Sequence, residues 1–156
     1  MAGLLQALVA VSQKAAEVAR LCRAEEPLFR LLVAEKTGPE RNARFLQDFK
    51  TLADVLIQEV IKHDLGTQFP ELRGHIHGEE SSEFRDVHGG MVTVRVGATP
   101  GDTATLLLAV LGPEQTRAAE LLAEAVHREV TLGDMELAGI DPGVCPGDVG
   151  IWIDPI

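Results

Sequence analysis

Apolar residues near the start of the chain recur in alternating steps of four and three positions. Over residues 3–23 this stripe is formed by Leu4, Leu8, Val11, Ala15, Val18 and Cys22. Such spacing is typical of one face of an amphipathic helix. We predict a second helix from Pro27, because proline suits the first helical position and two glutamates, Glu25 and Glu26, precede it. Residues 37–42 are predicted to be a loop.

A third helix is predicted over residues 52–64, with a buried side formed by Leu56, Ile57, Val60 and Ile61. Its start has two interpretations. Either Asp54 is the N-cap, or Thr51 is the N-cap and Asp54 is the acid of a capping box three residues later. Both interpretations place Asp54 in or beside the first turn. Gly66 and Pro70 are expected to end this unit.

Three segments in the rest of the chain predict strands. Residues 75–77 form a short strand that leads into Gly78-Glu79-Glu80. Residues 91–96 alternate in the manner of a half-buried strand. Residues 149–154 are an apolar run that ends in Asp-Pro, which is typical of a buried strand that delivers a carboxylate to the edge of a sheet.

Between the last two strands the pattern predicts a pair of helices. A turn is expected at residues 99–101, followed by helices over 102–111 and 114–130 that Gly112-Pro113 separates. Residues 133–148 are rich in Gly, Pro and Asp and are predicted to be a loop.

The acidic composition argues against nucleic acid and anionic membranes as binding partners. The 156 residues include 24 acidic and 14 basic side chains, for a net charge of −10, and suit a single domain. An acidic chain is a poor ligand for nucleic acid or for an anionic membrane. No stretch approaches about 18 uninterrupted apolar residues, and the N-terminus lacks the features of a signal peptide. Two cysteines, Cys22 and Cys145, make no disulfide framework, so we expect a reducing, cytoplasmic location.

Three acidic signals lie in separate elements, at Asp54, at Glu79-Glu80 and at Asp154. Each has an ordinary alternative: a helix cap, a solvated pair in a turn, and a surface acid after a strand. Together they indicate a site for a hard divalent cation, which prefers carboxylate and carbonyl oxygen. His75 and His77 share one face of a predicted strand, but no third nitrogen ligand accompanies them, which favours surface histidines. Cys22 is expected in the core, and Cys145 in a loop without a role.

In this order, Asp54, Gly78-Glu79-Glu80 and Trp152-Ile153-Asp154-Pro155-Ile156 resemble the motifs of the inositol monophosphatase superfamily of magnesium-dependent, lithium-sensitive phosphatases. Within it, residues 11–16, 48–62 and 78–84 are most similar to the branch that acts on inositol polyphosphates. The resemblance covers essentially the whole chain and is loosest at residues 97–148, which look like an insertion.

The resemblance implies a role for each matching residue. Glu79 and Asp154 would ligate Mg²⁺ together with the backbone carbonyl of Ile156. Asp54 would hold the attacking water or a further metal, and Glu80 would support the site. Li⁺ would inhibit by occupying one metal position. The family residues that follow this motif, an Asp and then Ser/Gly-Thr, are absent after Ile156.

The resemblance also implies a fold and an activity. The fold would be α+β: the N-terminal part of the layered sugar-phosphatase domain over residues 1–156, with long N-terminal helices on a largely antiparallel sheet. The activity would be removal of the 1-phosphate from small-molecule inositol polyphosphates. We expect the 156-residue chain alone to be inactive. The alternatives are a 3'(2'),5'-bisphosphate nucleotidase and a catalytically silent truncated product. No feature of the sequence indicates an oligomeric state.

Overall fold

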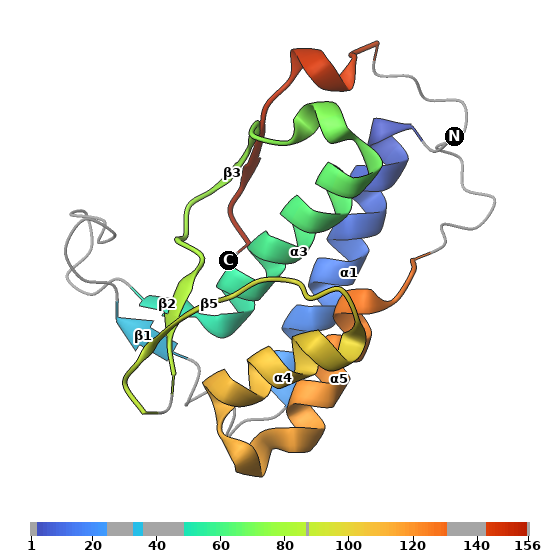
Figure 1. Cartoon of the computed structure of the whole chain (residues 1–156). Coiled ribbons are helices and arrows are strands. Elements are labelled where there is room, and N and C mark those ends of the chain that lie inside the picture. Colours follow the sequence, from blue (N-terminus) through green and yellow to red (C-terminus); the bar gives the residue numbers. More distant parts are fainter. Residues whose placement is uncertain (1–2, 25–32, 36–48, 87, 131–142, 156) are drawn as a thin grey trace.

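The computed structural model describes residues 3–24, 33–35, 49–86, 88–130 and 143–155 (Figure 1). The helices in these parts are α1 (Leu4–Ala24), α3 (Leu52–Gln68), α4 (Pro100–Leu111) and α5 (Thr116–His127), with short 3-10 helices at η2 (Pro70–Leu72), η3 (Pro113–Gln115) and η5 (Pro146–Asp148). The strands are β1 (Val33–Glu35), β2 (Phe49–Thr51), β3 (Ile76–Gly78), β4 (Glu83–Arg85), β5 (Met91–Thr93) and β6 (Ile151–Ile153).

The long helices α1 and α3 pack against each other, and α5 contacts both α1 and α4 (Figure 1). Their contact surfaces form the larger apolar core, whose fully buried members include Val18, Leu56, Val60, Leu107 and Leu122. The predicted stripe on α1 is confirmed in its main positions, since Leu4, Val11, Val18 and Cys22 are buried. Burial of these side chains supplies most of the drive for packing the helices together.

The strands form three separate pairs. β1 with β2 and β4 with β5 are antiparallel, whereas β3 and β6 are parallel. A second apolar cluster seats this parallel pair on α1 and α3; it consists of Leu4, Ala7, Val11, Leu65, Phe69, Leu72, Ile76 and Ile153. The structure thus confirms the α+β class with long N-terminal helices. Strands β1, β2 and β4, each three residues long, were not predicted.

The start of α3 settles between the two interpretations of Asp54. Thr51 is the N-cap, its side chain accepts a hydrogen bond from the backbone N–H of Asp54, and the Asp54 carboxylate accepts one from the backbone N–H of Thr51. This reciprocal pair is a capping box. The helix then continues through Gly66 to Gln68, beyond the predicted end at residue 64, and stops just before Pro70.

Several predicted boundaries need correction. Residues 99–101 are not a separate turn, since Thr99 caps α4 and Pro100 is the first residue of that helix. Proline suits this position because the backbone N–H that it lacks would have no partner within the helix. The strands predicted at 91–96 and 149–154 are shorter, and the helix predicted at 114–130 begins at Thr116 and ends at His127. The predictions at residues 27–32, 37–42 and 133–142 lie outside the described residues. None of the described helices combines the length and apolarity needed to cross a membrane.

Candidate metal centre

The parallel pairing of β3 and β6 brings two of the predicted acids to the same edge. Gly78 lies opposite Ile153 in the register and both strands end there, so Glu79 and Asp154 each follow directly after their strand. The backbone N–H of Glu79 donates to the carbonyl oxygen of Ile153 at 3.2 Å, which continues the pairing by one step. Both side chains are exposed. In proteins with parallel strands, ligands typically bind outside the carboxyl ends of those strands. Glu79 and Asp154 lie at such ends.

Asp54 lies in the first turn of α3 and is buried, with 7% of its surface exposed. Its Oδ2 accepts from the backbone N–H and the hydroxyl of Thr51, at 2.7 and 3.0 Å. Within the described part of the chain, its Oδ1 is buried and has no hydrogen-bond partner. The N-terminus of a helix stabilises a negative charge. The carboxylate therefore uses one oxygen for the capping box and leaves the other uncommitted.

Gln58 joins α3 to the turn that follows β3. Its side chain is fully buried; Nε2 donates to the carbonyl oxygen of Glu80 at 2.6 Å, and Oε1 accepts from the backbone N–H of Glu80 at 3.0 Å. Because Gln58 lies four residues after Asp54, the two side chains share one face of the helix. Sequence reasoning missed Gln58, and its one signal was a polar residue among the apolar positions of α3.

Gly78 allows this close approach. A Cβ atom at this position would lie 1.8 Å from Oε1 of Gln58, well inside van der Waals contact. The glycine of Gly-Glu-Glu thus leaves the space that the glutamine side chain occupies.

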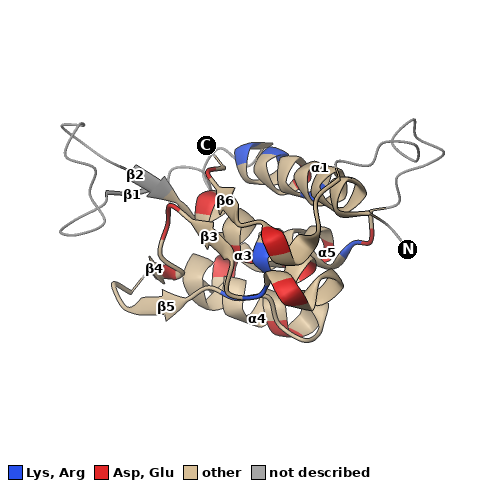
Figure 2. Cartoon of the chain, turned by 90° about the horizontal axis from the view of Figure 1, so that it is seen from above, with Lys and Arg blue, Asp and Glu red and all other residues tan. Residues whose placement is uncertain are grey.

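The described residues therefore link Asp54, Glu79, Glu80 and Asp154 through short steps, along α3 to Gln58 and across from β3 to β6. Figure 2 shows acidic segments where β3 and β6 end, near the mark for the C-terminus. Nevertheless, no three His, Cys, Asp or Glu side chains in the described residues form a ready-made metal cage. The donor chemistry and the uncommitted Oδ1 of Asp54 suit a hard cation. Ile156, the last predicted ligand, lies outside the described residues.

Comparison with known proteins identifies the relatives of the chain. All of it is similar to inositol polyphosphate 1-phosphatases. The identity over 156 residues is 47% to the protein from Mus musculus and 46% to those from Homo sapiens and Bos taurus. The chain spans 39% of the length of each of these curated relatives. No protein-family model matches the chain. The similarity confirms the resemblance on which the site residues rest.

The other candidate residues from the sequence are two histidines and two cysteines. His75 and His77 are exposed, which confirms that they are surface histidines. Cys22 is buried in the core, as predicted, and Cys145 is exposed; both are free thiols. Burial, and then the nearby charge of Asp54, raise the pKa of the Cys22 thiol to about 11.

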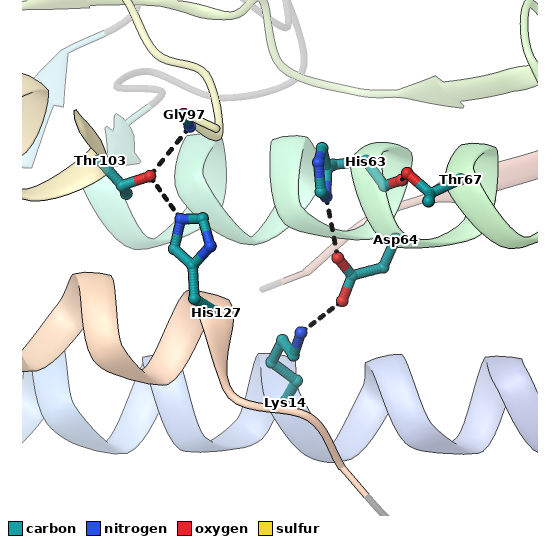
Figure 3. Close-up of polar contacts among 7 residues, drawn as sticks. All are labelled: Lys14, His63, Asp64, Thr67, Gly97, Thr103 and His127. Atoms are coloured by element: carbon teal, nitrogen blue, oxygen red, sulfur yellow. Dashed lines mark hydrogen bonds and ion pairs between the residues drawn. The ribbon is translucent and has the colours of Figure 1, made fainter. Parts of the chain in front are cut away.

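A second polar cluster lies towards the other end of α3 (Figure 3). Lys14 of α1 pairs with Oδ2 of Asp64 at 2.5 Å, and Nδ1 of His63 lies 3.0 Å from Oδ1 of the same carboxylate. Beside them, Nε2 of His127 lies 2.7 Å from the hydroxyl of Thr103. Burial, with added effects of His63 and Lys14, lowers the pKa of His127. Both oxygens of Asp64 have a nitrogen partner, so this cluster is charge-compensated.

Proposed function

We propose that this chain forms the metal-binding part of a magnesium-dependent phosphatase that removes the 1-phosphate from inositol polyphosphates, such as inositol 1,4-bisphosphate and inositol 1,3,4-trisphosphate. The observation that carries the proposal is the parallel register of β3 and β6, after which Glu79 and Asp154 follow directly at two neighbouring strand ends. The names of the relatives supply the substrate class. The cytoplasm is the proposed location, which is consistent with two free thiols.

In this proposal each acid has a distinct role. Glu79 and Asp154, exposed at the strand ends, would hold Mg²⁺ together with the carbonyl of Ile156. Asp54 would use its uncommitted Oδ1 for a bound water or a second cation, and Glu80 would support the turn. A bound cation supplies a water of lowered pKa and neutralises phosphate charge. Li⁺ would inhibit by occupying one of the cation positions.

A chimera tests the proposal. The matching stretch of the mouse relative would be replaced by residues 1–156 of this chain, and phosphate release from inositol 1,4-bisphosphate would be measured with and without Mg²⁺. We expect magnesium-dependent, lithium-sensitive turnover. Asp54→Asn, Glu79→Gln and Asp154→Asn should each reduce it at least about 100-fold, since the effects of a lost metal ligand exceed the roughly 10–100-fold effects of its supporting residues.

The exposed histidines provide the matched control. His75→Gln with His77→Gln should keep the turnover of the parent chimera, because neither side chain belongs to the proposed oxygen site. Faster hydrolysis of adenosine 3',5'-bisphosphate than of inositol 1,4-bisphosphate would favour a nucleotidase. A well-folded chimera without turnover on either substrate would favour a catalytically silent chain and contradict the proposal.

A further inference from the structure

We propose that Gln58 is a positioning residue for the metal centre: it fixes the backbone of Glu79 and Glu80 relative to Asp54 without itself binding the cation. This inference rests on the function proposed above. It goes beyond the motifs, which contain Asp54 and Gly78-Glu79-Glu80 but assign nothing to Gln58.

The hydrogen bonds hold Glu79 from both sides. Its own N–H donates to Ile153 of β6, and the next N–H along the chain, that of Glu80, donates to Gln58 of α3. The amide of Gln58 also donates to the carbonyl oxygen of Glu80. We call these two hydrogen bonds between Gln58 and the backbone of Glu80 the clasp. The peptide units on either side of Glu80 are thereby fixed in orientation. This sets the direction in which the Glu79 side chain leaves the strand end.

The clasp is also tied to Asp54 through a rigid element. Asp54 and Gln58 are one turn apart on α3, and the capping box holds the first turn of that helix. The side chain of Gln58 is fully buried and both of its polar atoms are hydrogen-bonded, so it has little freedom to rearrange. A carboxylate on the helix and a carboxylate after the strand are therefore held in one frame. Residues that orient metal ligands typically contribute about 10–100-fold to metal affinity.

Cation binding can be measured on residues 1–156 directly. The chain has one tryptophan and no tyrosine. Trp152 of β6 is two residues before Asp154, and both side chains are exposed. Emission of Tb³⁺ sensitised by Trp152 therefore reports on a cation near Asp154. Displacement of Tb³⁺ by Mg²⁺ gives the affinity for the proposed metal.

Gln58→Met is the main variant, because methionine retains the volume and removes both hydrogen bonds to Glu80. We expect its Tb³⁺ affinity to fall about 10–100-fold. Gln68→Met, an exposed position at the other end of α3, is the matched control and should bind as the parent does. Circular dichroism must show that both variants keep their helices. If Gln58→Met does not fold, Gln58→Glu replaces it; this variant keeps an acceptor for the N–H of Glu80 and loses the donor.

A double-mutant cycle tests the clasp itself. Gly78→Ala should weaken Tb³⁺ binding by displacing the Gln58 side chain, which a Cβ would meet at 1.8 Å. In a Gln58→Ala background the same change has room, so it should add less than about 2-fold to the loss. Additive losses would overturn the inference.

The outcomes separate the two proposals. If the parent chain gives no Tb³⁺ emission that Mg²⁺ displaces, the metal centre is wrong and the role of Gln58 falls with it. If the parent binds but Gln58→Met or its substitute binds within about 2-fold of the parent, the inference about Gln58 alone is overturned. A 10-fold or greater loss together with non-additivity in the cycle supports both.

Discussion

The two ends of helix α3 carry opposite kinds of polar cluster. Near its C-terminal end, Asp64 has Lys14 on one oxygen and His63 on the other. In its first turn, Asp54 has a capping-box partner on one oxygen and, in the described residues, no hydrogen-bond partner on the other. Buried polar atoms are normally paired, so an unpaired one needs an explanation. One cluster thus joins α1 to α3 through an ion pair, and the function proposed above assigns the uncommitted oxygen of the other to a cation.

The difference follows from what lies opposite each carboxylate. Asp64 faces α1, whose Lys14 is a long cation with its apolar stem buried in the helix contact. Asp54 lies one turn before Gln58, whose side chain is hydrogen-bonded to Glu80. In the described residues its Oδ1 has no hydrogen-bond partner. A carboxylate oxygen without a partner suits a hard cation, which prefers oxygen ligands.

The largest effect we expect concerns the thiol of Cys22, whose pKa is raised in part by the charge of Asp54. Since burial and the charge of Asp54 raise the pKa of Cys22 to about 11 from 9.0, its thiolate fraction at pH 8 is about 100-fold below that of an ordinary thiol. Iodoacetamide should label exposed Cys145 at least that much faster than Cys22, as measured by mass spectrometry. Comparable labelling rates in the folded protein would contradict the packing of α1 against α3 at this end.

Breaking the compensated pair should be the next largest effect. Lys14→Met leaves Asp64 with only His63 as a nitrogen partner, and we expect a loss of about 2 kcal/mol in the free energy of unfolding, below the full cost for a deeply buried pair because Asp64 is 24% exposed. Urea unfolding measures it. Lys62→Met, which removes the looser 3.7 Å pair with Glu59, is the control and should change stability by less than about 0.5 kcal/mol. Equal effects of the two changes would show that the Lys14–Asp64 pair stabilises the fold no more than the looser pair does.

Neutralising Asp54 should change the free energy of unfolding less than breaking the Lys14–Asp64 pair does. Asp54→Asn keeps an oxygen for the capping box and removes a charge from an acidic region, so we expect stability within about 0.5 kcal/mol of the parent. Asp54→Ala removes the cap and should cost about 1 kcal/mol. Urea unfolding without Mg²⁺ compares the two. A large loss in Asp54→Asn would show that its carboxylate is a structural group of the same kind as Asp64.

Local patterns predicted one part of this molecule well. The stripe on α1, the start of α3 at residue 52 and the placement of acids directly after strands all follow from spacing within a few residues. The capping box was one of two interpretations, because Asp54 fits either position in sequence and the backbone geometry decides between them.

Contacts between distant residues could not be predicted in the same way. Lys14 and Asp64 are 50 positions apart, and Gln58 meets Glu80 across 22 positions. Neither pair has a local pattern, and a three-residue strand such as β4 is too short to show alternation. The parallel register of β3 with β6 likewise depends on packing against α1 and α3. The sequence therefore indicated the acids of the candidate site but not the side chains that hold them.

The smallest effect we expect is a pH dependence of stability that comes from His127. This residue lies beside the cluster of Lys14, His63 and Asp64, whose positive charge disfavours a further proton. The pKa of His127 is lowered from 6.5 by burial, by His63 and by Lys14, against the opposing charges of Asp64 and Asp102. Below pH 6.5 the unfolded chain therefore binds a proton that the folded chain does not. The contribution of His127 to stability decreases as the pH falls, until the pH passes its folded pKa.

Urea unfolding between pH 7.5 and 5, a range chosen to bracket the ordinary histidine value of about 6.5, should show this loss in the parent and less of it in His127→Gln. His75→Gln, at an exposed position, should follow the parent. Identical slopes for the parent and His127→Gln would show that the neutral imidazole against Thr103 contributes nothing to the pH dependence of stability.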